Sequence, residues 1–448
     1  MSRLLIPLCI LPFLALPALA DTPTEAEKKE PEAAVPAQIN KAAGISPIAE
    51  ARAALAAGDV NTAEKLLAPL AESGDIDAMR ELSRLYREAE GPLQDPERAR
   101  LIDEKAWALG DVWAGTRIAG DLLGSDPVRA RGLLEEAAAM EGFKGWMVLG
   151  QLRLTGTGGD VDEAGAAEAF SKARDAGDNF ALIHLGRMAR DGRGLPQDGA
   201  DAIALFEAAL STSPEVSEVA MRELISGHGL GLFGAASNPE KAIEIAKDGL
   251  QKRSAGAALG ILSLPTRLET VYPDLVSLWE PALAIAGDAA DKGDPMAARR
   301  LLGYWHVASL ESQDAARQAA EIADRYAGVL DPDQLQRHRV VYAAMNGAKP
   351  AEIAETFKNA KGKEAASAIF DLQKANLNAY VAVLQSKLGE RGFYEGEANG
   401  KMNKRTISAI NAFCREAKID DICAVGPLSW QTAQALGVAL MMEKSGSR

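Results

Sequence analysis

The loop RDGRGLPQD, residues 190–198, places Gly192 and Gly194 beside Pro196 and Asp198. A glycine-rich loop can cradle a phosphate when a strand precedes it and a helix N-terminus with Lys, Ser or Thr follows it. Here a helical pattern precedes the glycines and an acidic residue follows them. These residue types argue against phosphate binding and indicate a joint between helices.

The four histidines, His184, His228, His306 and His338, are the next candidates for chemistry. A hydrolytic zinc site needs His, Asp and Glu side chains gathered around one ion, whereas these histidines are solitary and spread over different copies of the pattern described below. Glycan cleavage needs two carboxylates, but 63 acidic residues guarantee accidental pairs. No serine has a nucleophile-elbow setting. We therefore expect no catalytic residue, no metal site and no cofactor.

The segments that carry these residues repeat along the chain. When Gly74 and Gly177 are taken as anchors, each followed by aspartate, five positions agree in register 103 residues apart. The matching pairs are Ala78 and Ala181, Leu82 and Leu185, Gly91 and Gly194, Gln94 and Gln197, and Asp95 and Asp198. Anchors at 110 and 141 divide the interval into 36, 31 and 36 residues, and Gly293 restarts the pattern after weaker copies near 213 and 253.

Each copy has the pattern of two helices. Leu82 and Leu85 share a face with Ala78, and this small residue allows the first helix of the copy to approach closely. One helix pair cannot cover its apolar faces, so the copies are expected to stack. Loop glycines permit positive φ where the second helix ends. The sequence thus predicts an all-α fold, with a right-handed α-solenoid of helix-turn-helix repeats over residues 46–325.

Residues 166–198 resemble a Sel-one-like repeat, a relative of the tetratricopeptide repeat. The resemblance rests on residues that recur in such copies: Gly177-Asp178, Ala181, Leu185-Gly186, Gly192, Gly194 and Gln197-Asp198. The copy at 63–99 matches well and the others loosely. The resemblance implies a superhelical scaffold for protein partners, without catalysis. It also implies, for a bacterial chain, export and service in envelope assembly or signalling complexes.

Residues 326–375 have helical patterns and are expected to cap or link the repeats. Within them, residues 337–339 (Arg-His-Arg) form either a basic contact patch or a solvated helix face, and we favour the solvated face. Residues 376–440 then change character, with glycines at 389, 392, 396 and 400. Apolar spacing predicts three short helices in this second module, near 378–390, 404–417 and 428–436.

This second module resembles the peptidoglycan-binding domain of wall-associated proteins. The matching residues are Leu384-Gln385, Leu388, GFYEG (392–396), Gly400, Thr406, Ala409-Ile410, Phe413, Gly426-Pro427, Trp430 and Leu436. The chain departs from the family at three positions, with Asn399 for its usual Asp, Asn403 for its Gly and Cys414 for its Gln. The resemblance implies peptidoglycan binding. The alternative is a structural or protein-docking module.

The side chains of this module suit a glycan ligand. Three aromatic side chains could offer flat faces to sugar rings, and four polar ones could bond to the polar edges. The candidates for peptidoglycan binding are Phe393, Tyr394, Asn399, Asn403, Lys404, Arg405 and Trp430. The alternative for the aromatic residues, above all Phe393 and Trp430, is that they are core.

Cys414 and Cys423 are expected to form a disulfide, because an exported chain with two nearby cysteines favours one bridge. A thiolate nucleophile is the alternative. It needs a nearby base, and no histidine follows His338.

The N-terminal 20 residues have the layout of a secretory signal peptide. Arg3 precedes an apolar run, and Ala18-Leu19-Ala20 precedes Asp21. A membrane anchor is the alternative, but the run is short and interrupted by prolines. We expect a periplasmic protein without a membrane span after cleavage, with a disordered leader at 21–45 and a tail at 441–448. The net charge of −14 argues against nucleic acid as a partner.

Together these features predict a periplasmic scaffold or adaptor. Its repeats would bind a protein partner, and its C-terminal module would tether that partner to peptidoglycan. Two alternatives remain open from the sequence, a regulator of a sensor kinase and a scaffold of an exopolysaccharide export complex. A cell-wall hydrolase is the least favoured.

Overall fold

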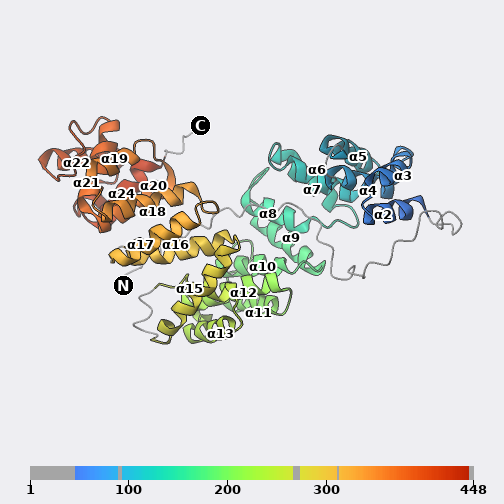
Figure 1. Cartoon of the computed structure of the whole chain (residues 1–448), viewed down its shortest axis with the longest axis horizontal. Helices are drawn as coiled ribbons and strands as arrows, with labels where there is room; N and C mark the ends of the chain where they lie inside the picture. Colours follow the sequence, from blue (N-terminus) through green and yellow to red (C-terminus); the bar gives the residue numbers. More distant parts are fainter. Residues whose placement is uncertain (1–45, 89–92, 266–272, 310–311, 443–448) are drawn as a thin grey trace. The chain divides into compact units, whose positions relative to one another are not determined.

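The computed structural model describes residues 46–88, 93–265, 273–309 and 312–442 (Figure 1). Within these ranges every regular element is a helix and no strand is present, so the all-α class is confirmed. The chain divides into two compact units, residues 1–196 and 197–448. The expected signal peptide, the leader and residues 443–448 of the expected tail lie outside the described residues. None of the helices described is long and apolar enough to span a membrane.

The first unit is built from helices that follow one another as hairpins. They are α2 (Pro47–Ala56), α3 (Val60–Glu72), α4 (Ile76–Glu88), α5 (Pro96–Ala108), α6 (Val112–Leu122), α7 (Pro127–Ala138), α8 (Trp146–Thr155), α9 (Glu163–Asp175) and α10 (Phe180–Asp191). Each helix packs against the next one along the chain. This nearest-neighbour packing is the defining property of a solenoid, as the repeat predicts.

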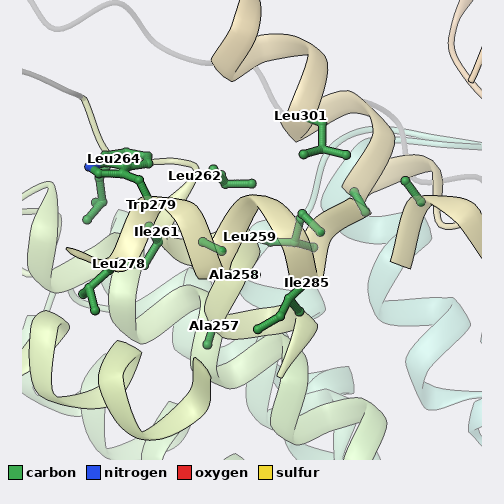
Figure 2. Packing of buried hydrophobic residues seen from close by; sticks show 14 of the residues in the cluster. Ala257, Ala258, Leu259, Ile261, Leu262, Leu264, Leu278, Trp279, Ile285 and Leu301 are labelled. Atoms are coloured by element: carbon green, nitrogen blue, oxygen red, sulfur yellow. The ribbon is translucent and has the colours of Figure 1, made fainter. Parts of the chain in front are cut away.

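The second unit continues with helix pairs and two 3-10 turns. These are α11 (Gly199–Leu210), α12 (Pro214–Gly229), η3 (Gly234–Ala236), α13 (Pro239–Gln251), α14 (Ala255–Ile261), η5 (Pro273–Leu275), α15 (Val276–Asp291), α16 (Pro295–Ser309) and α17 (Gln313–Arg325). One apolar cluster, running from Ile225 of α12 to Leu335, joins α12 to α17. Figure 2 shows members of this cluster from α14, α15 and α16, among them Trp279, Ile285 and Leu301.

The chain ends in a helical bundle that extends beyond the expected second module. Its helices are α18 (Pro332–Met345), α19 (Pro350–Thr356), α20 (Gly362–Ala375), α21 (Leu377–Glu390), α22 (Lys404–Ala417), α23 (Asp420–Cys423) and α24 (Trp430–Met441). All of them except the short α23 fall where the sequence predicts helices. A single apolar cluster joins Val340 of α18 to Met441 of α24, so α18–α20 share one core with the module that follows.

The predicted disulfide is confirmed. Cys414, near the end of α22, is bonded to Cys423 of α23. Both cysteines are buried in the core of the bundle. The bridge fixes α23 beneath the loop that leads to α24, where a bundle of this size has few apolar residues to spare.

The four copies that are anchored at a glycine followed by aspartate have the same joint between their two helices. Gly74, Gly110, Gly177 and Gly293 have φ angles of 91°, 90°, 93° and 92°. In each copy the amide of the following aspartate bonds to the carbonyl five residues before it, at 2.9–3.1 Å. This left-handed turn is the usual way for a helix to end at glycine. The aspartate side chain then accepts an amide of the next helix, as Asp178 does from Phe180 at 3.0 Å.

The residues after the joint pack as the repeat predicts. The small residue four positions on is completely buried in each copy: Ala78, Ala114, Ala181 and Ala297. The residue eight positions on is also buried: Leu82, Ile118, Leu185 and Leu301. A common turn therefore sets a common rotation of the second helix, which presents the same face to the core each time.

The loop at 190–198 is a joint of a second kind. Gly192 ends α10 in the left-handed conformation, with φ 69°. Gly194 has φ 68°, and a Cβ added there would lie 2.1 Å from the carbonyl oxygen of Glu163. Asp198 accepts the amide of Ala200 at 2.8 Å and so caps α11. Close backbone approach requires the glycine, and the acidic residue that argues against phosphate is a helix cap.

The weak copy near 253 keeps the joint without the glycine. Arg253 has φ 57°, in the region that favours glycine. The amide of Ser254 still bonds to the carbonyl of Gly249 at 2.9 Å, and the Ser254 hydroxyl caps Ala257 at 3.0 Å. The turn therefore survives at the cost of backbone strain of about 1 kcal/mol.

Candidate binding site in the C-terminal module

A shallow polar pocket lies where the loop after α21 meets the start of α22. It is lined by Tyr394, Gly396, Glu397, Asn399, Asn403, Lys404 and Arg405. Five of the seven residues that the sequence nominates for peptidoglycan binding are among these. The structure thus brings together residues of the loop and of the start of α22, namely Tyr394, Asn399, Asn403, Lys404 and Arg405.

A buried glutamine holds the loop in place. The side-chain amide of Gln385 on α21 donates to the Lys401 carbonyl at 3.0 Å and to the Thr406 hydroxyl at 2.9 Å. Its carbonyl oxygen accepts the amide of Gly400 at 2.9 Å. A Cβ on Gly400 would lie 2.4 Å from the carbonyl oxygen of Asn378, so only glycine lets the loop come this close to α21.

The two asparagines have structural tasks as well as exposed ends. Asn403 caps α22, because its carbonyl oxygen accepts the amide of Thr406 at 3.0 Å. The Asn399 carbonyl oxygen accepts the amide of Lys401 at 3.0 Å. Asparagine therefore performs the local turn function at both positions. Both amide NH2 groups belong to exposed residues that line the pocket.

The cations at the pocket stand at the N-terminus of α22. Lys404 and Arg405 are its first two residues and are exposed. Arg405 also donates to the Glu395 carbonyl at 2.9 Å, which fastens the loop to the helix. Helix N-termini favour anions, so this side of the pocket suits a carboxylate, while Glu397 and the asparagine amides suit hydroxyl and amide groups.

The aromatic candidates take different positions. Tyr394 lines the pocket but is only 7% exposed, and its hydroxyl donates to the Glu397 carbonyl at 3.4 Å. Phe393 packs edge-to-face against Phe413 with ring centroids 5.5 Å apart, as a core residue. Trp430 is 56% exposed at the start of α24 and does not line the pocket. Sequence reasoning missed Glu397, whose place on the rim follows only from the path of the loop.

The histidines are not all solitary, which corrects the expectation from the sequence. His306 of α16 and His338 of α18 lie edge-to-face with ring centroids 4.3 Å apart. The Nε2 atom of His306 is 3.0 Å from a carboxylate oxygen of Asp371 on α20, and the Arg337 Nε donates to that oxygen at 2.7 Å. Distance in sequence misled the prediction, because successive helices bring residues some 30 positions apart side by side.

The same cluster corrects the favoured interpretation of residues 337–339. Arg337 is directed into the bundle, where it also pairs with Glu364 at 3.2 Å, and only Arg339 is exposed. Burial raises the pKa of Asp371, but the bond with His306 and the charge of Arg337 outweigh it and hold that pKa below its usual value. Burial, aided by the neighbouring His306 and Arg337, lowers the pKa of His338 to about 2.

The other two histidines pack against neighbouring residues of their own unit. His184 stacks on Phe170 with ring centroids 4.5 Å apart. His228 is 3% exposed, and its Nδ1 atom accepts the amide of Asn238 at 3.1 Å. Among the described residues, no group of three or more His, Cys, Asp or Glu side chains is placed to hold a metal ion.

Two solved structures are similar to the chain at low identity. One is a protective antigen present in uropathogenic Escherichia coli strains that displays an SLR fold, with 17% identity over 92% of this chain and 98% of that chain, and a TM-score of 0.42. The other is a Sel1 repeat protein from Oxalobacter formigenes, with 19% identity over 48% of this chain and 91% of that chain, and a TM-score of 0.40. No protein-family model and no curated protein matches the chain.

Proposed function

We propose that this chain is a Sel-one-like repeat scaffold of the bacterial periplasm. Its helical repeats bind a protein partner, and its C-terminal module tethers the complex to peptidoglycan. The observation that carries the scaffold role is the joint shared by Gly74, Gly110, Gly177 and Gly293, with φ angles within 3° of one another. A stack of equivalent hairpins offers an extended surface, which is the feature that repeat proteins use to hold partners.

The tether is supported by the pocket at the start of α22. Lys404, Arg405 and the helix N-terminus favour the carboxylates of wall peptides. Asn399 and Asn403 offer amide donors to sugar hydroxyls and peptide carbonyls. The periplasmic location is supported by the sequence of the N-terminal 20 residues.

Binding to purified peptidoglycan sacculi tests the tether. Truncation at residue 377 is a poor test, because α18–α20 would lose their shared core. A Lys404→Glu substitution leaves the core intact, since this side chain is exposed. We expect sacculus binding to weaken about tenfold, which corresponds to about 1.4 kcal/mol.

The matched control is Lys363→Glu, which makes the same charge change on an exposed residue at the start of α20. It should retain binding. Equal retention of the Lys404 variant and the unchanged chain would refute a tether at this pocket.

Cross-linking of the full chain in cells tests the scaffold role. Photoreactive residues at exposed positions of the repeats should give a discrete adduct with another protein. If no position yields a protein adduct, the scaffold role is wrong.

A further inference from the structure

An aromatic and cationic ladder follows one edge of the first unit. Its members come from three consecutive repeats: Trp113, Lys144, Trp146, Lys172 and Phe180. The Lys144 ammonium lies 5.0 Å from the centre of the Trp113 ring, and the Lys172 ammonium lies 4.5 Å from that of Trp146. Trp113 and Phe180 are 36% and 42% exposed. Trp146, in the repeat between them, is partly buried.

The repeat itself creates this alignment. Trp113 and Phe180 each lie three residues after a joint glycine, and Trp146 is the first residue of α8. All three therefore stand at the start of the second helix of their repeat. The same edge carries the N-termini of α6, α8 and α10, each at least ten residues long. Their dipoles add positive potential beside the two lysines.

The charges of the ladder select its occupant. Lys172 pairs with Glu168 at 2.8 Å, but both side chains are about half exposed, and such surface pairs contribute little. A carboxylate from a partner can therefore replace Glu168. Lys144 is exposed and stands over the face of the Trp113 ring, so its ammonium and the edge of the ring are available to a ligand. Exposed tryptophan beside a cation is the residue combination typical of interface hot spots.

Other classes of partner fit less well. A nucleic acid carries a negative charge at every phosphate, so a chain with a net charge of −14 repels it along its whole length, whereas a polypeptide can place a few carboxylates at the two lysines. A sugar would need the flat faces of the tryptophans, yet each has a lysine ammonium over it. An acidic polypeptide can use both the lysines and the aromatic rings of the ladder. Its carboxylates pair with the lysines, and its apolar side chains pack against the exposed ring edges.

We propose that the edge formed by Trp113, Lys144, Trp146, Lys172 and Phe180 is the partner-binding surface of the repeats. Its occupant is an acidic protein segment with interspersed apolar side chains, which lies along the three repeats. This inference rests on the scaffold role proposed above and names the class of partner.

The test measures binding of a fluorescent poly(Glu,Tyr) copolymer to the full chain at low and moderate salt. Binding should weaken with salt, because exposed charges are screened. The Trp113→Ala/Phe180→Ala variant removes exposed rings, and the Lys144→Glu/Lys172→Glu variant reverses the cations. Each should weaken binding at least tenfold.

The matched control is Leu101→Ala/Lys65→Glu, which changes an exposed apolar residue and an exposed lysine away from the ladder. It should bind the copolymer as the unchanged chain does. Circular dichroism checks that all three variants keep their helices, and Lys144→Glu alone replaces any variant that does not.

Two results would overturn the inference. One is equal copolymer affinity for the ladder variants and the control. The other is ladder-dependent binding of alginate, a polyuronate, without binding of the copolymer. Cross-linking in cells separates the two proposals. If a partner is captured equally by the ladder variants, the scaffold role stands and the ladder is not its surface. If the unchanged chain captures none, the scaffold role itself fails.

Discussion

Acidification should loosen the bundle of α16, α18 and α20 because of His338. The pKa of this residue is lowered to about 2 in the folded chain, mainly by burial, while its ordinary value is about 6.5. The unfolded chain therefore binds one more proton below pH 6.5, and stability falls as the pH falls. Between pH 7 and pH 5 a fully expressed shift of this pKa lowers the free energy of unfolding by about 2 kcal/mol. Because the ring is only partly buried, although its Nδ1 atom is shielded, we expect 1–2 kcal/mol, on the order of that value.

The neighbouring groups do not reverse this sign. The pKa of Asp371 is lowered from its ordinary value of 3.8, so this residue stabilises the folded chain above that pH. Its stabilisation is lost only in stronger acid. Arg337 stays charged throughout, and its charge opposes protonation of His338. His306 and Glu364 also face the cluster. The interval from pH 7 to pH 5 therefore isolates the histidines from Asp371.

Hydrogen exchange measured by mass spectrometry is the assay, since a chain of two units does not guarantee a single unfolding transition. Opening free energies of peptides from α18 and α20 are compared at pH 7 and pH 5, after correction for intrinsic exchange. His338→Phe keeps a ring of similar size and removes the proton site, so its opening free energy should vary less with pH. If the variant and the unchanged chain lose the same free energy, burial of His338 is not the cause.

Further changes test the joints, the ion network and the bridge. Gly177→Ala should lower the opening free energy of α9 and α10 by about 1–2 kcal/mol, because alanine is strained at φ 93°. Arg253→Gly should raise the opening free energy of α13 and α14 by about 1 kcal/mol, because glycine relieves the strain at φ 57°. Asp103→Ala should lower the opening free energy of α4–α6, measured by hydrogen exchange, by roughly 3 kcal/mol, because this buried carboxylate accepts hydrogen bonds from two arginines. Cys414→Ser should lower the thermal stability of the bundle by about 2–3 kcal/mol, and a reductant should have no further effect on that variant.

Local features were predictable from the sequence. The joint at 190–198 could be recognised because glycine, proline and a capping aspartate act within a few residues of one another. The bridge between Cys414 and Cys423 could be predicted because the two residues are near in a sequence whose first 20 residues have the layout of an export signal. Five of the seven candidate pocket residues lie together because Gly396 and Gly400 shape one short loop before α22.

Contacts between distant helices were not predictable. His306, Arg337 and Asp371 belong to three helices, and no pattern in one helix indicates the other two. Trp430 could not be separated from core tryptophans by its spacing, yet it is exposed. The copy near 253 is weak in the sequence because Arg253 adopts the positive φ at a position where the other copies have glycine.

The regular joints also explain why a ladder can arise in the first unit. A turn with nearly the same φ at Gly110 and Gly177 sets the rotation of the second helix in these two copies, so Trp113 and Phe180 stand at equivalent places. Selection then needs only one residue per repeat to extend a surface across the stack. At the corresponding place in the second unit, three residues after Gly293, the chain has Met296, which lies partly buried against the core. The turn alone therefore does not make an edge available for binding, and the residue at this position and its neighbours decide whether the side chain is exposed.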